Sequence, residues 1–456
     1  MSKFSSGSGI GRRRLIRGAG LGLAGLALAY TPAFNASRLI CMDEVPPPGK
    51  GFGPLVRDPK GMLDLPAGFS YKIIARRGQI MDDGFRIPGN HDGTGVLSLA
   101  DGSYRLLIDH EVAADQPHRS PYPGNERPPE DKVYDPVCFG GVTAIDLSPN
   151  LEVKQTFLRL AGTERNCSGV MTQWGTWLST EESYASPGGK HNYQKPHGFV
   201  FEVPGQGDGL ATPKPLPALG RFQHEGIARD PEQGTIYMTE DTERSCFYKF
   251  EPDVQGDLSS GKLFALRIID AQGVDTSNRG KKDDKKFTQG ETVDVDWVEL
   301  TDPDPEGQEL RYIARKAGAA SFSRGEGATW HDGGVVFNAT NGGPRKLGQV
   351  WRFQPGMGET GNLKLLSEPR SECKMNMPDN AAVQPNGDLL LTEDNFRYTR
   401  LLGLTPQGTP YPFAYFRHSS REELAGIVYS PDGRFLYVGA YEAGLSFLIE
   451  GPFMGT

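Results

Sequence analysis

Cysteine is scarce in this chain, and the few cysteines that occur are scattered. Five stand among 456 residues, at positions 41, 138, 167, 246 and 373, and no two of them form a C-x-x-C pair. Zinc ribbons and disulfide scaffolds depend on closely spaced cysteines, so the sequence excludes both. Because the count is odd, at least one thiol is left free or ligated if the compartment is oxidising.

The chain also lacks an excess of positive charge and, beyond its N-terminus, any long apolar run. Its formal net charge is -8. Such an acidic balance argues against nucleic acid and anionic membrane as partners. A membrane-spanning helix needs ~20 predominantly apolar residues, so we expect no membrane span in the mature chain.

The N-terminus has the three-part layout of an export signal. A basic run, Arg12–Arg17, precedes the uncharged segment Gly18–Ala29, which ends in the small-x-small sequence Ala27-Leu28-Ala29. The paired arginine predicts a twin-arginine signal peptide over residues 1–29, and hence the twin-arginine export machinery as a partner and a periplasmic or secreted protein. A membrane anchor is the alternative, but the run is short and rich in glycine. The twin-arginine route carries folded proteins, which suggests a metal inserted before export.

Cleavage would make the chain more acidic still. Residues 1–29 contain Lys3, Arg12, Arg13, Arg14 and Arg17 but no acidic residue, so the formal charge moves from -8 to -13. A solvated acidic surface is one explanation of this charge, and a protein that collects cations is the other.

Glycine and proline are abundant, and a single pattern recurs. The 59 glycines and 35 prolines favour tight turns and short strands over helices. In each copy a small residue opens an apolar stretch, a turn rich in Asp, Asn, Gln and Gly follows, and a second apolar stretch ends in polar or acidic residues. The six copies run over residues 95–111, 169–182, 226–241, 327–341, 380–394 and 426–442.

Each copy is typical of a β-hairpin, and six copies indicate a radial repeat. We therefore predict an all-β fold, a six-bladed β-propeller with loop insertions, occupying residues 30–456 as one domain. The copies would form the inner strand pairs of the blades. Residues 270–310, rich in Lys, Asp and Pro, are expected to be an exposed insertion. A pair of β-sandwiches and a seven-bladed propeller are the alternatives.

The repeat also predicts a site. In a hairpin the start of the first strand and the end of the second lie at the same end, so the residues that precede each copy should meet its acidic ending around one mouth of the channel. Crowded carboxylates repel one another unless cations hold them, and hard oxygen ligands in this number indicate calcium-like ions. A single thiolate among them, Cys167, indicates a softer metal such as iron. The residues concerned are His91, Asp92, Glu111, Asn166, Cys167, Ser168, Glu181, Glu182, His224, Glu225, Glu240, Asp241, Arg324, Glu326, Asp379, Glu393 and Asp394.

Other conspicuous residues have plainer interpretations. Aspartate at a hairpin end is often a turn or cap residue. His224 is expected to be a packed histidine rather than a ligand. We expect Cys138, Cys246 and Cys373 to be structural. Trp174, Trp177 and Trp330 are expected in the blade cores.

At these positions the sequence resembles the PhoX family of secreted, calcium-dependent alkaline phosphatases, over nearly the whole mature chain. The matching segments are residues 51–55, 63–69, 88–93, 166–169, 174–177 with 181–182, 220–225, 324–327, 378–380 and 425–426. The resemblance implies a propeller that hydrolyses phosphate monoesters with a mixed Fe(III) and Ca²⁺ cofactor. The chain is a short member, which suggests that substrate-side insertions are missing.

The resemblance also implies roles for individual residues. Cys167 would be the iron thiolate ligand, Glu225 and Glu326 would bind the metal cluster, and Arg324 would bind phosphate, with a salt bridge to Glu326 as its alternative role. Cys167, Glu326 and Arg324 would thus form the catalytic set. Together with the blade endings, the predicted metal ligands are Cys167, Glu225, Glu326, Glu182, Asp379, Glu240, Glu393 and Glu111.

Two functions of other classes stay open at this point. A calcium-dependent propeller hydrolase such as a lactonase would need the carboxylates but neither the thiolate nor the arginine. A non-catalytic binding propeller would use its mouth to recognise a partner. We favour the phosphatase, acting on small-molecule phosphate esters as a monomer.

Overall fold

The computed structural model describes residues 50–454 apart from 125, 283, 308, 396–398 and 419–421, and these lie in one compact unit. The predicted signal segment lies outside the described residues. Strands dominate: the helical elements of the described residues are α2 (Leu310–Lys316), η1 (Pro117–Arg119), η2 (Glu130–Lys132) and η3 (Pro217–Leu219). None of the helices in this part of the chain has the length and apolar character that a membrane crossing requires.

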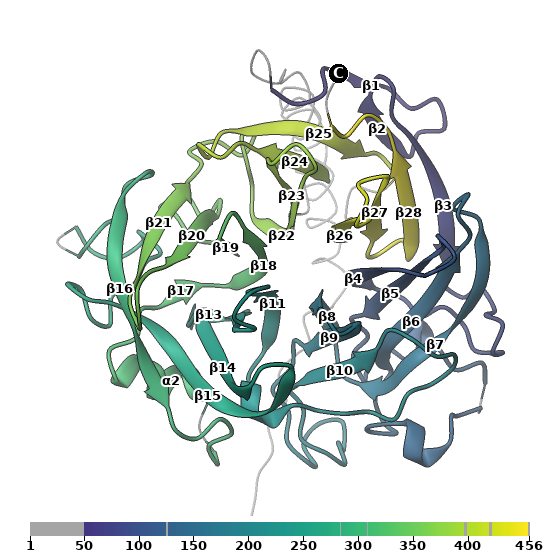
Figure 1. Ribbon diagram of the computed structural model, residues 1–456, viewed down its shortest axis with the longest axis horizontal. Helices are drawn as coiled ribbons and strands as arrows, with labels where there is room; N and C mark the ends of the chain where they lie inside the picture. The colour runs from purple at the N-terminus through teal and green to yellow at the C-terminus, as the bar shows by residue number, and fades with distance from the viewer. Residues whose placement is uncertain are drawn as a thin grey trace, which may run out of the picture. The chain divides into compact units, whose positions relative to one another are not determined.

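Six inner strands form a ring (Figure 1), and residues of all six line one central cavity, the channel of the fold. Each contacts the next in chain order, and the last contacts the first, so the ring is closed. A closed ring of this kind is a six-bladed propeller, which confirms the predicted fold. The inner strands are β4 (His91–Ser98), β8 (Asn166–Met171), β11 (His224–Arg229), β18 (Gly325–His331), β22 (Pro378–Val383) and β26 (Leu424–Tyr429).

The remaining strands build the blades outward and are as follows: β1 (Leu55–Val56), β2 (Leu63–Pro66), β3 (Ser70–Arg76), β5 (Tyr104–His110), β6 (Gly140–Leu147), β7 (Val153–Thr163), β9 (Thr176–Glu181), β10 (Val200–Pro204), β12 (Ile236–Glu240), β13 (Glu243–Ser245), β14 (Tyr248–Val254), β15 (Asp257–Ile268), β16 (Thr292–Leu300), β17 (Phe322–Ser323), β19 (Gly334–Ala339), β20 (Gln349–Pro355), β21 (Gly361–Ser367), β23 (Leu389–Glu393), β24 (Arg400–Leu404), β25 (Pro410–Phe416), β27 (Phe435–Ala440) and β28 (Leu445–Glu450). The predicted hairpins are the innermost pair of each blade, from β4–β5 round to β26–β27.

The blades differ at their outer edges. Blade one is β4-β5-β6-β7 and blade two is β8-β9-β10. Blades three and four share one nine-stranded sheet, because β16 pairs with β15 on one side and with β21 on the other. Part of the predicted insertion at 270–310 is therefore a strand that joins two blades. Blade five, β22 to β25, is extended by β2 and β1, and a short ribbon of β13 and β17 stands apart.

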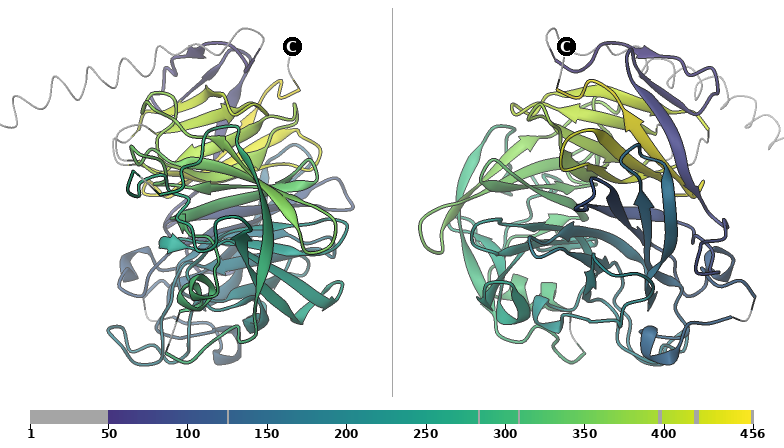
Figure 2. Two further views of the ribbon diagram at one scale, coloured as in Figure 1. Left: turned by 90° about the vertical axis from the view of Figure 1, so that its left-hand side faces the viewer. Right: turned by 45° about the vertical axis from the view of Figure 1, so that its right-hand side comes forward.

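The ring is closed by pairing the two ends of the described chain. β3 is the outer strand of blade six, antiparallel to β28, with Ser70 opposite Glu450 and Arg76 opposite Leu445 (Figure 2). Strand pairing across the closure removes the exposed edges that an open ring would have. The N-terminal part of the propeller is thereby held to its last blade.

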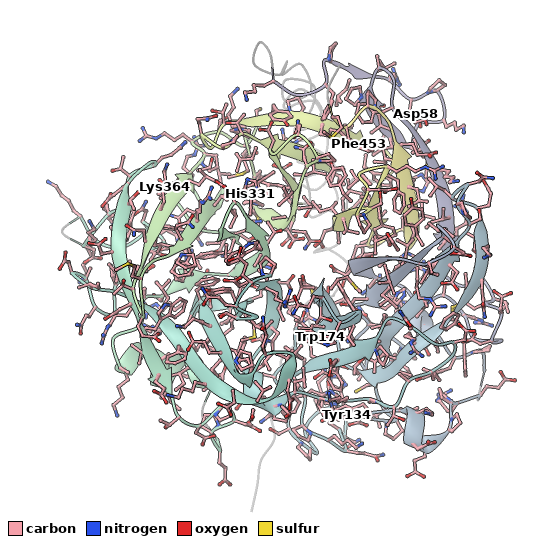
Figure 3. The ribbon with its side chains drawn as sticks, in the orientation of Figure 1. Asp58, Tyr134, Trp174, His331, Lys364 and Phe453 are labelled. Atoms are coloured by element: carbon pink, nitrogen blue, oxygen red, sulfur yellow. The ribbon has the colours of Figure 1, made fainter. Side chains whose placement is uncertain are left out.

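Apolar side chains fill the spaces within and between the blades (Figure 3). Between blades three and four, for example, Phe247 stacks on Phe337 with ring centroids 4.2 Å apart. Trp177 is buried as predicted. Trp174 and Trp330 are only partly buried and pack against the margins of two core clusters.

All six inner strands carry an irregularity at the same place. The register with the neighbouring strand shifts just after the first residues of each strand, as between His91 and Thr94 in β4 or between Gly325 and Ala328 in β18. Glycine occupies this position in several strands. A Cβ on Gly327 would lie 2.6 Å from the Asp379 carbonyl oxygen and 2.6 Å from the Asn380 Cα of the next blade. The bulges thus bring neighbouring inner strands into backbone contact.

We predict that Gly327→Ala destabilises the propeller more than Gly102→Ala does. The added methyl group at position 327 meets backbone atoms that cannot move aside, which should cost about 3 kcal/mol. Gly102 has a φ of 78° but open space around it, so alanine there should cost about 1 kcal/mol of backbone strain. Thermal melting of both variants measures the difference, and an equal or smaller effect at Gly327 would contradict the close-contact argument.

Candidate metal centre

One end of the channel is lined by a group of side chains that we call the mouth cluster. Five members are the second residue of an inner strand, and two directly follow the second strand of a blade. This shared position places them at the same end of the ring. The members are Asp92 on β4, Cys167 on β8, Glu225 on β11, Glu326 on β18, Asp379 on β22, Glu111 after β5 and Glu182 after β9.

The members of the mouth cluster lie close enough to share metal ions. Three overlapping triplets have potential ligand atoms within 4.8 Å of one another, and the Cys167 Sγ lies 3.8 Å from Asp92 Oδ2. Cys167 belongs to two of the triplets and Glu225 to two, so the triplets form a continuous arc. The triplets are Asp92, Glu111 and Cys167; Cys167, Glu182 and Glu225; and Glu225, Glu326 and Asp379.

Burial and mutual repulsion oppose the charged forms of these groups. Burial, with the neighbouring charges of Glu225 and Glu111, raises the pKa of Asp92 well above its ordinary value. The pKa values of Glu225 and Glu326 are raised in the same way, and burial raises the pKa of Asp379 to about 7. Burial beside Asp92 also raises the pKa of the Cys167 thiol.

Two buried carboxylate oxygens of the cluster have no hydrogen-bond partner among the described residues, namely Asp92 Oδ1 and Glu225 Oε1. A buried acceptor without a partner is costly, and buried charges are normally paired or coordinate a metal. Bound cations would satisfy these oxygens and favour the ionised form of the cluster. The donor set, with many hard oxygens and one thiolate, therefore fits a metal centre.

Two arginines supply positive charge at the mouth. Arg324 holds Asp241 through two bonds of 2.8 and 2.9 Å, Glu326 at 2.8 Å and Asp394 at 3.1 Å. Its side chain is 27% exposed, so it borders the mouth and solvent. The predicted ion pair with Glu326 is present. Any part that Arg324 plays with phosphate must be compatible with these three carboxylates.

Arg165 occupies the corresponding place in blade two, and sequence reasoning missed it. Its Nε donates to Glu111 at 2.7 Å, and its Nη2 pairs with Glu182. Arg165 and Arg324 each stand two residues before a cluster member, and each has a φ of 53°, in the left-handed region that non-glycine residues seldom adopt. An arginine stands two residues before a cluster member in both repeats, and this recurrence is the sequence signal from which Arg165 could have been found.

The structure does not bring Glu240 and Glu393 into the mouth cluster, which corrects the predicted ligand set. Glu240 accepts hydrogen bonds from Arg311 at 2.9 Å and from the Tyr248 hydroxyl at 2.8 Å, and Glu393 accepts two from Arg400 at 2.7 and 2.8 Å. Side chains of consecutive strand residues point to opposite sides.

The next residue along the chain points toward the mouth in each of these two blades. Asp241 and Asp394 both contact Arg324. Blade two follows the same rule, because Glu181 turns away to His197 whereas Glu182 belongs to the cluster.

Glu423, just before β26, is a further acid at the mouth that the repeat did not reveal. Its carboxyl hydrogen-bonds Asp379, and burial together with Asp394 and Asp379 raises its pKa well above the ordinary value. It stands two residues before Ala425, the second residue of β26, which is the position that Arg165 and Arg324 occupy in their own repeats. Its position completes the acidic lining on the side of blade six.

His224 lies outside the cluster, as the sequence predicted. Its ring is buried and stacks on Phe222 at 3.7 Å between centroids, and its Nε2 lies 3.0 Å from the Gly220 carbonyl oxygen. Cys138 and Cys246 are buried free thiols outside the mouth cluster.

Comparison with known proteins places the chain in a family. The family model described as alkaline phosphatase PhoX matches residues 50–156 and 148–444. Among solved structures, Pseudomonas fluorescens PhoX in complex with vanadate, a transition-state analogue, is 18% identical with a TM-score of 0.66, and the match covers 91% of this chain and 99% of that one. At this identity the structural likeness shows the propeller fold.

Other solved structures match the chain at lower TM-scores. Virginiamycin B lyase from Staphylococcus aureus with quinupristin is 13% identical over 84% of this chain and 99% of that one, with a TM-score of 0.39. A gluconolactonase from Xanthomonas campestris is 9% identical over 89% and 99%, with a TM-score of 0.42. Comparison with curated protein sequences gave no match. The family match spans most of the described residues, and the chain therefore belongs to the PhoX family of alkaline phosphatases, which are phosphoric monoester hydrolases.

Proposed function

We propose that this chain hydrolyses small-molecule phosphate monoesters at a mixed Fe(III) and Ca²⁺ centre held by the mouth cluster. The observation that carries the proposal is the arc of six carboxylates and one thiol with two buried, unpartnered carboxylate oxygens. The family match supports the reaction and its dependence on metal. The chemistry of the donors supports the choice of metals.

The thiolate and the carboxylates of the mouth cluster suit different metals. Thiolate is a soft ligand that selects iron over calcium, so we assign Cys167 to iron. Glu225 shares a triplet with Cys167 and a second one with Glu326 and Asp379, which suits a carboxylate between metals. Calcium takes six to eight oxygen ligands, and we assign to it Glu111, Glu182, Asp379 and also Asp92, which the sequence placed at the mouth but not among the ligands. When bound, such a centre supplies Lewis-acid charge for the phosphate oxygens and activates an oxygen nucleophile.

The chain's own contribution to phosphate binding is Arg324. Three carboxylates fix its guanidinium at the mouth, so little reorganisation is needed when an anion arrives. The bond from Nη1 to Asp394 is the longest of its contacts, at 3.1 Å. We infer that Nη1 exchanges Asp394 for a phosphate oxygen while the two bonds to Asp241 keep the guanidinium in place. Planar guanidinium suits the phosphate geometry better than ammonium does.

The alternatives from other classes have less support. A lactonase-like hydrolase or a binding propeller has no need for a thiol among the carboxylates. Here Cys167 is a member of two triplets of the mouth cluster. The similar gluconolactonase is too remote in structure to favour its own reaction here. The phosphatase remains the single function that we propose.

We further propose export by the twin-arginine route, with a monomer released to the periplasm or beyond. The basic pair at Arg12 and Arg13 and the small-x-small ending at Ala29 support this. A centre assembled from five blades forms only once the propeller has folded, which suits a route that carries folded proteins. Export would then follow metal insertion.

The role of Arg324 can be tested by substitution. Arg324→Lys keeps the charge but loses the planar fork, so kcat/KM for an aryl phosphate and inhibition by inorganic phosphate should both weaken. Arg324→Ala should lower kcat/KM by about 2–4 kcal/mol of transition-state binding, roughly 30- to 1,000-fold. Iron and calcium content should stay unchanged in both variants, because arginine is not a ligand.

The matched control is Arg267→Ala. Arg267 also makes a two-bond ion pair, with Asp296 at 2.8 and 2.6 Å, but on the outer strands of blade three. It should keep full activity. If Arg324→Ala is as active as the control, Arg324 does not bind phosphate. If Arg324→Ala loses metal and activity together, its role is to neutralise the acids around it.

The corrected ligand set can be tested with a pair of glutamates. Glu225→Gln removes a ligand charge and should release metal, measured as iron and calcium per chain. Glu240→Gln should keep the metal content but lower stability by ~3 kcal/mol, because it removes the fully buried partner of Arg311 and leaves only the partly exposed Glu309. Equal metal loss in both variants would restore Glu240 to the ligand set and overturn its assignment to the blade interior.

A further inference from the structure

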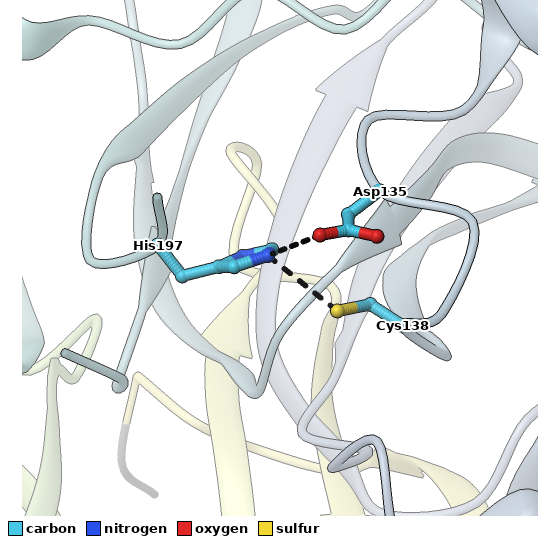
Figure 4. A group of neighbouring side chains, drawn as sticks. All are labelled: Asp135, Cys138 and His197. Carbon is cyan, nitrogen blue, oxygen red and sulfur yellow. Dashed lines mark hydrogen bonds and ion pairs between the residues drawn. The ribbon is translucent and has the colours of Figure 1, made fainter. Parts of the chain in front are cut away.

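A second cluster of ligand-type side chains lies away from the mouth, between blades one and two. Asp135 and Cys138 stand in the long connection from β5 to β6, and His197 stands in the connection from β9 to β10. All three side chains are fully buried, and Figure 4 shows the carboxylate and the thiol converging on one edge of the imidazole. The ligand atoms lie within 4.8 Å of one another.

The hydrogen bonds of His197 fix which nitrogen faces the other two groups. Its Nδ1 lies 2.7 Å from Glu181 Oε1, the distance of a strong bond in which Nδ1–H donates. Its Nε2 lies 3.3 Å from Asp135 Oδ2 and 3.5 Å from Cys138 Sγ. An imidazolium bonded to the Asp135 carboxylate should close to about 2.7–2.9 Å. The separation from Asp135 is longer than that of a charge-assisted bond, whereas the separation from Cys138 is ordinary for a contact between nitrogen and sulfur.

The same distances agree with the edges of a tetrahedral metal site. Zinc binds histidine nitrogen and carboxylate oxygen at about 2.0–2.2 Å and thiolate sulfur at about 2.3 Å. Tetrahedral angles then place nitrogen about 3.4 Å from oxygen and about 3.6 Å from sulfur. The observed separations of 3.3 and 3.5 Å match both edges.

The surroundings hold the three groups in this arrangement. Asp135 Oδ2 accepts the backbone N–H of Gln194 at 2.7 Å and of Lys195 at 3.0 Å. Glu181, which orients His197, itself accepts the N–H of Glu164 at 2.9 Å. A carboxylate behind the far nitrogen of a histidine is the usual second-layer partner of a metal-bound imidazole.

A cysteine nucleophile is the competing explanation, because Cys138, His197 and Glu181 stand in the order of a thiol, a base and an orienting acid. A nucleophile must reach its substrate, however, and both Cys138 and His197 have 0% of their surface exposed. That explanation also gives Asp135 no part in the chemistry, only its bonds to the backbone of Gln194 and Lys195. A buried structural ion accounts for all four residues.

We propose that Asp135, Cys138 and His197 bind a structural zinc ion, which nothing in the phosphatase reaction requires. Mixed nitrogen, sulfur and oxygen donors in tetrahedral array suit zinc rather than calcium. Glu164, whose carboxyl hydrogen-bonds the Cys138 side chain, lies beside this group of three and would move toward the ion to serve as the fourth ligand. The ion ties the long β5–β6 connection of blade one to the β9–β10 connection of blade two, and through Glu181 it steadies the neighbouring Glu182 of the mouth cluster.

The test is the zinc content of the purified full-length protein. Wild-type protein should carry one zinc per chain, and Cys138→Ser should lose it and melt at a lower temperature. Cys246→Ser removes another buried thiol and should keep the zinc. Cys167→Ser should keep it too, which separates this site from the thiol of the mouth. Wild-type protein without zinc, or Cys138→Ser with its full zinc content, would overturn the proposal.

Cobalt substitution provides a measurement on the wild-type protein, with a variant of the mouth thiol as its control. Wild-type protein grown with cobalt(II) should show the intense visible bands of a tetrahedral ion and a thiolate-to-cobalt charge-transfer band. Added zinc should abolish these bands. Cys167→Ser should retain both. Their absence in folded wild-type protein, or an octahedral spectrum, would count against the site, and their loss in Cys167→Ser would assign them to the mouth instead.

Discussion

The buried acids of the mouth cluster repel one another, and the fold is stable only if this repulsion is balanced by positive charge. Five inner strands each bring one ligand-type side chain to the channel mouth, and the blade endings add more. Two arginines, Arg165 and Arg324, neutralise part of this charge but do not contact the unpartnered oxygens of Asp92 and Glu225. Such an array is stable in its charged form only with bound cations. Folding, metal binding and catalysis are therefore coupled in this chain.

The backbone makes this crowding possible. Each inner strand bulges just after its second residue, which is a ligand-type residue in five of the six, and small residues at the bulge let neighbouring strands meet backbone to backbone. Gly93 illustrates this, because a Cβ there would lie 2.6 Å from the Ser168 Cα and 2.7 Å from the Cys167 carbonyl oxygen. A propeller with ordinary side chains at these positions would have a wider mouth. Its ligands would then be too far apart to share ions.

The features that local residue patterns encode, such as turns and hairpins, could be predicted from the sequence. The features that depend on strand register could not. Turn residues and apolar flanks are local signals, so the six hairpins, and with them the blades and the mouth, could be recognised. Whether Glu240 or Asp241 faces the mouth depends on strand parity, which a bulge can reverse, and here the wrong residue of the pair was chosen. The bridging role of β16 and the meeting of Asp135, Cys138 and His197 arise from tertiary contacts between residues up to 72 positions apart, for which no motif exists.

The central claim is that Cys167 binds iron within the mouth cluster, and the visible absorption spectrum of the exported protein tests it most directly. A ferric ion bound by thiolate gives an intense charge-transfer band, and serine oxygen cannot give it. The account predicts a coloured wild-type protein, a colourless and iron-depleted Cys167→Ser protein, and an unchanged spectrum for Cys246→Ser, which alters a buried thiol outside the cluster. A phosphatase that is fully active without the band, or a Cys167→Ser protein that keeps both its colour and its iron, would contradict it.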